Sequence, residues 1–227
     1  MPWGQLNWLK TASPGTAKKF FNTSTSFVVG NSPMPGLAAT AMPLFTSLHD
    51  YFNAGATMSG SQFPWVCYDI ENWAKTLEIE KRHVKLALWA FTDLAHARGQ
   101  KVVAAPSRDI IYAKGADDPW QSPETIDQGY LRVGIPLACD DAEIFLCQCQ
   151  NDEKDTDAYS TLIAAADRQT SSTQLLWSAL TTNFATGAQM KAAYDSLVNA
   201  GTSVSGYWVT IAAQSQVQTA IDFFNLL

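Results

Sequence analysis

Apolar residues along this chain recur in two spacings, which predict alternating strands and helices. Short runs of β-branched, aromatic and aliphatic residues are typical of buried strands, and apolar residues three or four positions apart indicate helices packed on one face. The predicted strands cover residues 26–30, 65–71, 101–106, 143–150, 174–180 and 205–211, with a weaker strand at 55–60. The predicted helices cover residues 37–54, 76–98, 123–133, 155–169, 186–200 and 214–226.

Alternation of this kind predicts parallel strands joined by right-handed crossovers. Ile144, Leu175 and Gly206 occupy similar points in three successive predicted strands and follow one another at steps of 31 residues. That step is the size of one strand plus one helix, so we expect an α/β fold, a (β/α) TIM-like barrel of seven or eight parallel strands. The alternative is an open doubly wound sheet, which the lack of a glycine-rich phosphate turn after any predicted strand disfavours.

The expected domain organisation is simple. Residues 1–24 hold Pro2, Pro14 and Gly15 and show no clear periodicity, so they are expected to form an irregular N-terminal arm or the first segment of the barrel. Residues 25–227 are expected to form a single barrel domain, because their length and hydrophobic content of 47% support one substantial core.

Charge narrows the choice of partners. Only 16% of the residues are charged, the net charge is -6 and the isoelectric point is about 4.9. Nucleic acids and anionic membranes bind proteins through clustered Lys and Arg. This chain has only short patches of Lys and Arg, so neither is expected as the partner. No apolar run approaches the roughly 18 residues of a membrane span. The first residues lack the pattern of a signal peptide, which favours the cytoplasm, or secretion if a signal has been removed.

Two acidic residues end one of the predicted strands, which is otherwise apolar. In the stretch from Trp65 to Trp73, Asp69 and Glu71 stand two positions apart, and strand side chains alternate between faces, so both acids point to one side. Burying two carboxylates on one face is unfavourable unless water, a partner group or a substrate meets them. We therefore expect this strand end to carry chemistry.

Polar and aromatic residues gather where the other predicted strands end. In a parallel barrel these carboxyl ends form the active site. Amides there hydrogen-bond hydroxyl groups, and aromatic rings stack on sugar C–H faces, so the expected substrate is a polar small molecule or an oligosaccharide. The expected substrate contacts are Trp73, Arg108, Gln148, Gln150, Asn183, Tyr207 and Trp208.

The segment Asp69-Ile-Glu-x-Trp73 resembles the last part of the acidic motif of family-18 chitinases and the Asp-x-Glu strand of family-25 lysozymes. The resemblance covers one strand and the general (β/α) architecture. It implies that Glu71 is the proton donor of a glycoside hydrolase and that Asp69 tunes it. The upstream acids and glycines of the family-18 motif are replaced here by residues 64–67.

Other functions remain open on the sequence alone. No second catalytic carboxylate stands out, so Asp109 or an assisting group of the substrate would have to fill that role. A non-enzymatic barrel that binds a glycan is one alternative, and a metal-dependent lyase or hydrolase using Asp69, Glu71 and Asp109 is another. A further alternative is structural, with Arg108 forming a salt bridge to both acids. No metal or other cofactor is expected for the leading interpretation.

The four cysteines are expected to be buried free thiols, with a disulfide from Cys139 to a later cysteine as the alternative. Strand alternation in 143–150 places Cys147 and Cys149 on the side that faces the helices. Gln148 and Gln150 then face inward.

Overall fold

Parallel strands form the centre of the protein, in a computed structural model that describes residues 1–171, 173–183 and 185–227. Six strands pair in the order β3-β4-β5-β6-β7-β8, and β1 pairs with β2. All these pairs are parallel, which confirms the predicted α/β class. Within the described residues the strands do not close into a barrel, because β3 and β8 end the larger sheet. The strands are β1 (Phe27–Val29), β2 (Thr40–Met42), β3 (Leu44–Phe45), β4 (Trp65–Tyr68), β5 (Lys101–Ala104), β6 (Ile144–Cys147), β7 (Leu175–Thr181) and β8 (Val204–Thr210).

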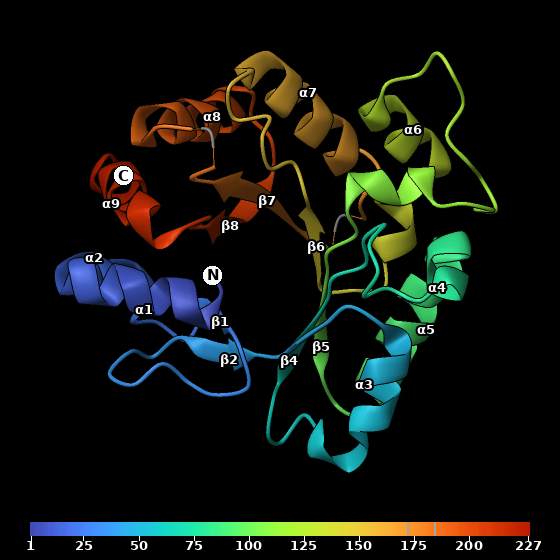
Figure 1. Cartoon of the computed structure of the whole chain (residues 1–227), viewed down its shortest axis with the longest axis horizontal. Coiled ribbons are helices and arrows are strands. Elements are labelled where there is room, and N and C mark those ends of the chain that lie inside the picture. The colour runs from blue at the N-terminus through green and yellow to red at the C-terminus, as the bar shows by residue number, and fades with distance from the viewer. Residues whose placement is uncertain (172, 184) are drawn as a thin grey trace.

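Helices surround the strands and supply the crossovers between them (Figure 1). Thr125 and Thr186 each form a capping box with a glutamine three residues later, which explains why two of these helices begin where they do. In the described part of the chain, none of the helices has the length and apolar character needed to cross a membrane. The helices are α1 (Trp3–Ala12), α2 (Pro14–Phe21), α3 (Leu48–Ala54), α4 (Glu78–Arg82), α5 (Val84–Ala97), α6 (Ile126–Val133), α7 (Thr156–Asp167), α8 (Gly187–Asn199) and α9 (Val217–Asn225).

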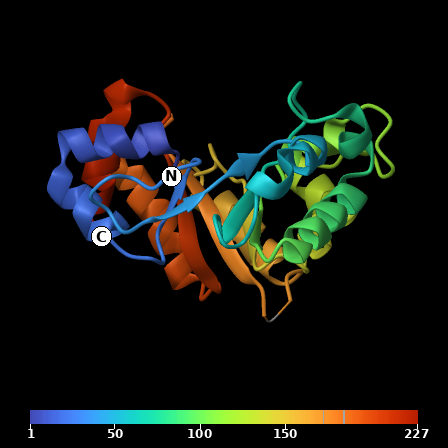
Figure 2. The ribbon, with the colours of Figure 1, turned by 90° about the horizontal axis from the view of Figure 1, so that it is seen from below.

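The expectation that residues 1–24 form an irregular arm is wrong, because α1 and α2 fill most of that segment. Leu6 and Leu9 of α1 are fully buried, and Phe21 of α2 packs against Phe224 of α9. Pro14 is tolerated because it occupies the first position of α2, where no helical N–H bond is needed. Seen from below, these blue helices lie beside the red α9, and the green α4 and α5 lie on the other side of the strands (Figure 2).

Only the last part of the helix predicted over residues 37–54 is helical, as α3. The strands β2 and β3 occupy the part before it. Pro43 separates the two strands, and its carbonyl accepts a hydrogen bond from Cys67 N–H at 2.8 Å. Ser47 then caps α3 by accepting from His49 N–H. The weak strand expected at 55–60 is also wrong, because Gly55–Thr57 is a short 3-10 helix. The long helix expected over 76–98 is divided at His83 into α4 and α5.

The larger sheet is strongly curved, as the contacts of Phe27 demonstrate. Its ring centroid lies 5.1 Å from that of Trp65 on β4 and 5.3 Å from that of Trp177 on β7. These strands are three places apart in the sheet, about 14 Å in a flat sheet, so one ring could not reach both without curvature. We call Phe27, Trp65 and Trp177 the aromatic floor of the concave face. Gly206 fits against this floor, since a Cβ there would lie 2.4 Å from Trp177 Nε1.

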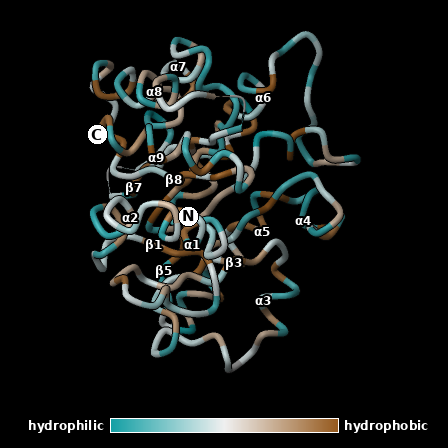
Figure 3. Tube along the Cα trace, turned by 60° about the vertical axis from the view of Figure 1, so that its left-hand side comes forward, coloured by the Kyte–Doolittle hydropathy of each residue, from teal (hydrophilic) through white to brown (hydrophobic). Residues whose placement is uncertain are grey.

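The opposite face of the sheet packs against the helices. Tyr68 of β4 stacks on Phe91 of α5 with ring centroids 4.3 Å apart. Cys149 contacts Ser178, whose hydroxyl also bonds Tyr159 of α7, so the cysteines of residues 147–149 do face the helices as predicted. All four cysteines are buried free thiols, and no disulfide joins them. Hydrophobic segments, brown in Figure 3, run through the middle of the molecule, and many outer turns are teal or white.

Candidate active site

Asp69 and Glu71 lie just beyond the carboxyl end of β4. Asp69 N–H donates to Phe45 O at 2.8 Å, so the chain keeps its strand register past Tyr68. Glu71 N–H instead donates to Thr76 Oγ1 at 3.3 Å, which begins the turn toward α4. The two carboxyl groups are hydrogen-bonded to each other, so they share one side of the chain as predicted.

Gln148 binds this acid pair from the other side of the site. Its Nε2 donates to Asp69 Oδ1 and to Ala105 O, both at 2.6 Å. Gln148 also forms a parallel bridge with Ser107, one residue beyond the end of β6. The side chain therefore links the ends of three neighbouring strands, and its inward direction confirms the predicted alternation of residues 143–150.

Burial raises the pKa of both acids. For Glu71 the rise reaches about 8, because desolvation is reinforced by the negative charges of Asp69 and Asp109 and by the bond to Asp69. For Asp69 burial raises the pKa to about 6, and hydrogen bonds from Gln148 and Glu71 oppose that rise. Two adjacent carboxyls titrate as a pair, and the pair holds one proton at neutral pH. Glu71 is the residue that carries it and donates to Asp69.

Arg108 does not pair with these acids, so the structural salt bridge considered from the sequence is wrong. Its Nη1 lies 2.5 Å from Asp127 Oδ1 and 2.6 Å from Asp152 Oδ2, and its Nε donates to Gln148 O at 3.1 Å. The Arg108 side chain is only 12% exposed. Two carboxylates thus neutralise its charge, and Arg108 holds the first turn of α6 and the loop after β6 in place.

Two cavities meet at the acid pair. The inner cavity has a volume of about 180 Å³, and the outer cavity about 450 Å³. Both are lined by Glu71, Gln148, Gln150 and Thr210, so Glu71 stands at their junction. The inner cavity is completed by Asp69, Ala105, Leu146 and Trp208. The outer cavity is completed by Ser107, Arg108, Asp109, Ile126, Asn151, Thr181, Asn183 and Ala212.

Most of the predicted site residues come together at these cavities, with two exceptions. Trp73 lines neither cavity, and its indole N–H donates to Thr76 Oγ1 at 3.0 Å. Tyr207 alternates with Trp208 along β8, so it faces the helices, and its ring packs on Tyr194 of α8 with centroids 5.0 Å apart. Asp109 does reach the outer cavity, where its Oδ1 accepts from Asn72 N–H at 3.1 Å.

Three acids that support the site were missed in the sequence. Asp127 and Asp152 bind Arg108, and Glu153, only 1% exposed, accepts from the N–H groups of Asn151 and Thr181 at 2.7 and 2.6 Å. Glu153 therefore ties together the loops after β6 and β7. The pair 152–153 directly follows a predicted strand, and that position is the signal that could have identified it.

Among the described residues, no group of three or more His, Cys, Asp or Glu side chains has an arrangement that could hold a metal ion. The set of Asp69, Glu71 and Asp109 considered from the sequence is therefore not such a group.

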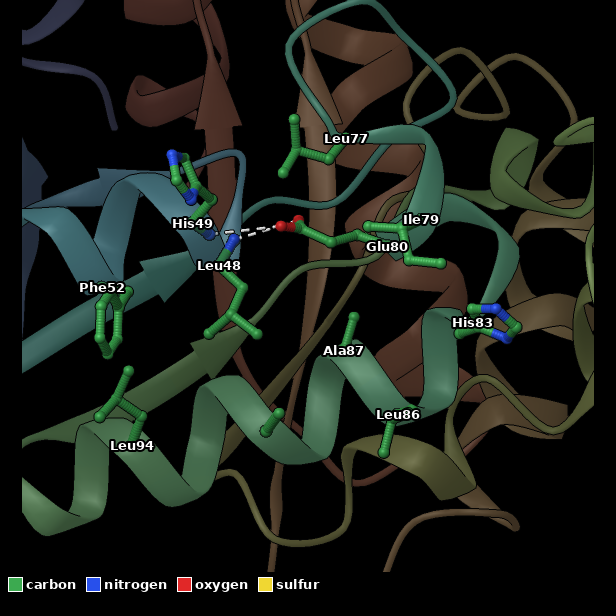
Figure 4. A pocket seen from close by; sticks show the side chains of 11 residues that line it. Leu48, His49, Phe52, Leu77, Ile79, Glu80, His83, Leu86, Ala87 and Leu94 are labelled. Carbon is green, nitrogen blue, oxygen red and sulfur yellow. Dashed lines mark hydrogen bonds between the residues drawn. The ribbon is translucent and has the colours of Figure 1, made fainter.

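A larger cavity lies elsewhere, in an apolar groove of about 710 Å³ between α3, α4 and α5 (Figure 4). Its one carboxylate is that of Glu80, which accepts from Ser47 Oγ, Leu48 N–H and Tyr68 OH, each at 3.0 Å. These bonds make Glu80 a buried capping group for the start of α3. The groove lacks the acid and amide pairing of the β4 and β6 ends, so we assign the candidate site to the inner and outer cavities. The groove is lined by Leu48, His49, Phe52, Leu77, Ile79, Glu80, His83, Leu86, Ala87, Ala90 and Leu94.

No protein-family model matches the chain, and no curated protein matches it significantly.

Proposed function

We propose that the protein cleaves a carbohydrate by general acid catalysis, with Glu71 as the acid. The observation that carries the proposal is the hydrogen-bonded Asp69–Glu71 pair at the junction of two polar cavities. A general acid works best when it is protonated at the operating pH, and the raised pKa of Glu71 meets that condition. The resemblance of the Asp-x-Glu segment to glycoside hydrolases supports the same roles.

The proposed reaction is hydrolysis of a glycosidic bond. Glu71 transfers its proton to the glycosidic oxygen while the bond from that oxygen to the anomeric carbon breaks, and the leaving sugar departs as an alcohol. Asp69 accepts a hydrogen bond from Glu71 beforehand and, held by Gln148, keeps the acid oriented toward the junction. Water adds to the anomeric carbon and gives up a proton, which restores Glu71 by the end of the cycle.

The second carboxylate of the proposed reaction is Asp109. It lines the outer cavity, and its charge acts on both Asp69 and Glu71. In this role Asp109 accepts the proton of the attacking water, as the base of a glycosidase does, and then releases a proton to solvent while Glu71 takes one up. The bond from Asn72 N–H to Asp109 Oδ1 supports the role, because it fixes one oxygen of the carboxylate.

We also infer that the strands form a (β/α) barrel left open between β8 and β1. The contacts of Phe27 with Trp65 and Trp177 support strong curvature. The segment at the start of α1 occupies the open side, where Gln5 Oε1 accepts from Ile211 N–H at 2.8 Å and Pro2 bridges to Val29. The acids would then lie at the carboxyl rim, where such barrels place their chemistry.

The experiment that tests the function is hydrolysis of a glycan panel by wild type and by the Glu71→Gln variant, with glycan binding measured in parallel. Glu78→Gln is the matched control, because Glu78 is an exposed residue of α4 that pairs with Lys81 on the same helix and lines neither cavity of the site. Loss of turnover in Glu71→Gln alone, with binding retained, supports the proposal. Binding without turnover by wild type on any glycan overturns it in favour of a glycan-binding protein.

A further inference from the structure

We infer that the inner cavity binds a single terminal, uncharged sugar residue, so that the protein removes sugars one at a time from a chain end. This inference rests on the proposed function and deepens it. The carrying observation is that Glu71 stands between a small cavity of about 180 Å³ and a larger one of about 450 Å³. When Glu71 protonates a glycosidic bond, the sugar on one side of that bond therefore lies in the inner cavity and the sugar on the other side lies in the outer cavity.

The inner cavity is closed at its deep end. Ala105, Leu146 and Trp208 line it and are 1%, 2% and 8% exposed. The inward faces of β4 and β7 carry the aromatic floor nearer their amino ends, and Trp65 lies on the same face as Asp69. A sugar chain cannot continue past these side chains. The outer cavity differs, because its lining includes the exposed Asn151 and Ala212.

The volumes fit one sugar ring inside and more than one outside. At about 30 Å³ per liquid water, the inner cavity of about 180 Å³ has the volume of about six waters, close to that of one pyranose ring with its hydroxyl groups. The outer cavity of about 450 Å³ is more than twice as large. The inner cavity therefore holds one sugar residue, and the remainder of the glycan extends through the outer cavity.

The lining also selects the kind of sugar. The titratable groups of the inner cavity are the acids Asp69 and Glu71, and this pair keeps one negative charge, so an anionic sugar would meet like charge there. Trp208 offers an indole ring, held by the bond from its Nε1 to Thr210 Oγ1 at 3.1 Å. Aromatic faces of this kind stack on the C–H face of a neutral pyranose, and the amides of Gln148 and Gln150 suit its hydroxyls. The expected ligand is an uncharged hexose.

The first test measures product size with wild-type protein. Linear oligosaccharides of neutral hexoses, labelled at the reducing end, are digested and sampled early. The expected result is free hexose together with labelled products that shorten by one unit at a time. Labelled products of intermediate length at the earliest time points would mean internal cleavage and would overturn the inference, while leaving the acid role of Glu71 intact.

The second test does not depend on turnover. Binding of free neutral hexoses and of the matching uronic acids is followed by tryptophan fluorescence in wild type and in Ala105→Leu, whose larger side chain occupies the inner cavity. We expect hexose binding to weaken more than about tenfold in Ala105→Leu, because the added atoms compete for the same space. Ala188→Leu, an exposed position on α8, is the control and should bind as wild type.

The two tests separate the inference from the proposed function. If no glycan is hydrolysed but hexose binding is lost in Ala105→Leu, the sugar site stands and the acid catalysis fails. If Ala105→Leu folds as judged by circular dichroism and still binds hexoses as wild type does, the inner-cavity assignment fails. Uronic acids that bind wild type as well as hexoses do would overturn the assignment of an uncharged sugar. Where Ala105→Leu does not fold, product size decides.

Discussion

Gln148 Nε2 donates to Asp69 Oδ1 at 2.6 Å, although the two residues stand 79 positions apart in the chain. The same nitrogen donates to Ala105 O, so one amide connects the ends of β4, β5 and β6. Because the bond favours the charged form of Asp69, it separates the acid pair into an acceptor and a proton carrier.

Replacing Gln148 with Leu should therefore affect both stability and titration. The variant leaves Asp69 Oδ1 and Ala105 O without this donor, which should lower the free energy of unfolding by about 1–3 kcal/mol. The pKa of Asp69 should rise further, since a bond to its charged form is lost. Urea unfolding and NMR titration of the carboxyl groups measure the two effects. Gln150→Leu, which removes an amide from the same cavities, should leave the pKa of Asp69 closer to its wild-type value.

Glu71→Gln should change how stability depends on pH. The folded-state pKa of Glu71 is about 8, above its usual value of 4.5. The proton on Glu71 therefore stabilises the folded protein fully at pH values below 4.5. This stabilisation is lost as pH rises through about 8. The neutral Gln has no such loss. The Tm of the variant minus the Tm of wild type should therefore become more positive from pH 5 to pH 9. Thermal unfolding monitored by circular dichroism checks this, and an unchanged difference would contradict the raised pKa.

Arg108→Gln should lower the free energy of unfolding more than the loss of a single surface ion pair does. The change leaves Asp127 and Asp152 without their cation in a site where Arg108 is 12% exposed. Breaking a buried pair in this way costs about 3–5 kcal/mol in unfolding free energy. Arg132→Gln is the matched control, because Arg132 also binds two acids, Asp118 and Glu124, but lies at the surface. Its unfolding midpoint in urea should move much less, and equal shifts would argue against the role of Arg108.

Gly206→Ala should disturb the aromatic floor. The added Cβ would lie 2.4 Å from Trp177 Nε1, so the indole must move away, at a cost of about 1–3 kcal/mol in unfolding free energy. Gly4→Ala is the opposite case, because nothing lies within 4 Å of a Cβ built there and the position is helical. That variant should be neutral or gain up to about 1 kcal/mol. Denaturant unfolding with tryptophan fluorescence distinguishes the two outcomes.

The strands from β4 to β8 could be predicted because their apolar runs are long and well separated. The acid pair and the inward direction of Gln148 followed from the same alternation. Before β4 the pattern located β1 and the last part of the helix expected over 37–54, but it did not locate α1, α2, β2 or β3. Leu6 and Leu9 of α1 are buried by contact with other elements, and two short strands around Pro43 share an apolar pattern with the helix that follows. In such segments tertiary contacts, rather than local periodicity, decide the structure.

The partners of charged residues were the least predictable part of the site. Arg108 adjoins Asp109 in sequence, yet it binds Asp127 and Asp152, because the turn after β5 directs its side chain toward the β6 end. Tyr207 and Trp208 were both expected at the site because they lie toward the end of their predicted strand, but alternation along β8 allows only one of the two to face inward. A sequence indicates which residues reach a strand end, whereas their ion-pair partners depend on how the crossovers fold back.

The aromatic floor also bears on how the chain folds. The Phe27–Trp177 contact joins residues about 150 positions apart, so the loop it closes spans most of the protein. Closing loops of that length is entropically costly and slows folding relative to proteins with local contacts. During synthesis the floor cannot be completed until β7 has left the ribosome. Until then Trp65 and Phe27 lack one of their packing partners, and we expect this interval to be when the nascent chain depends most on chaperones.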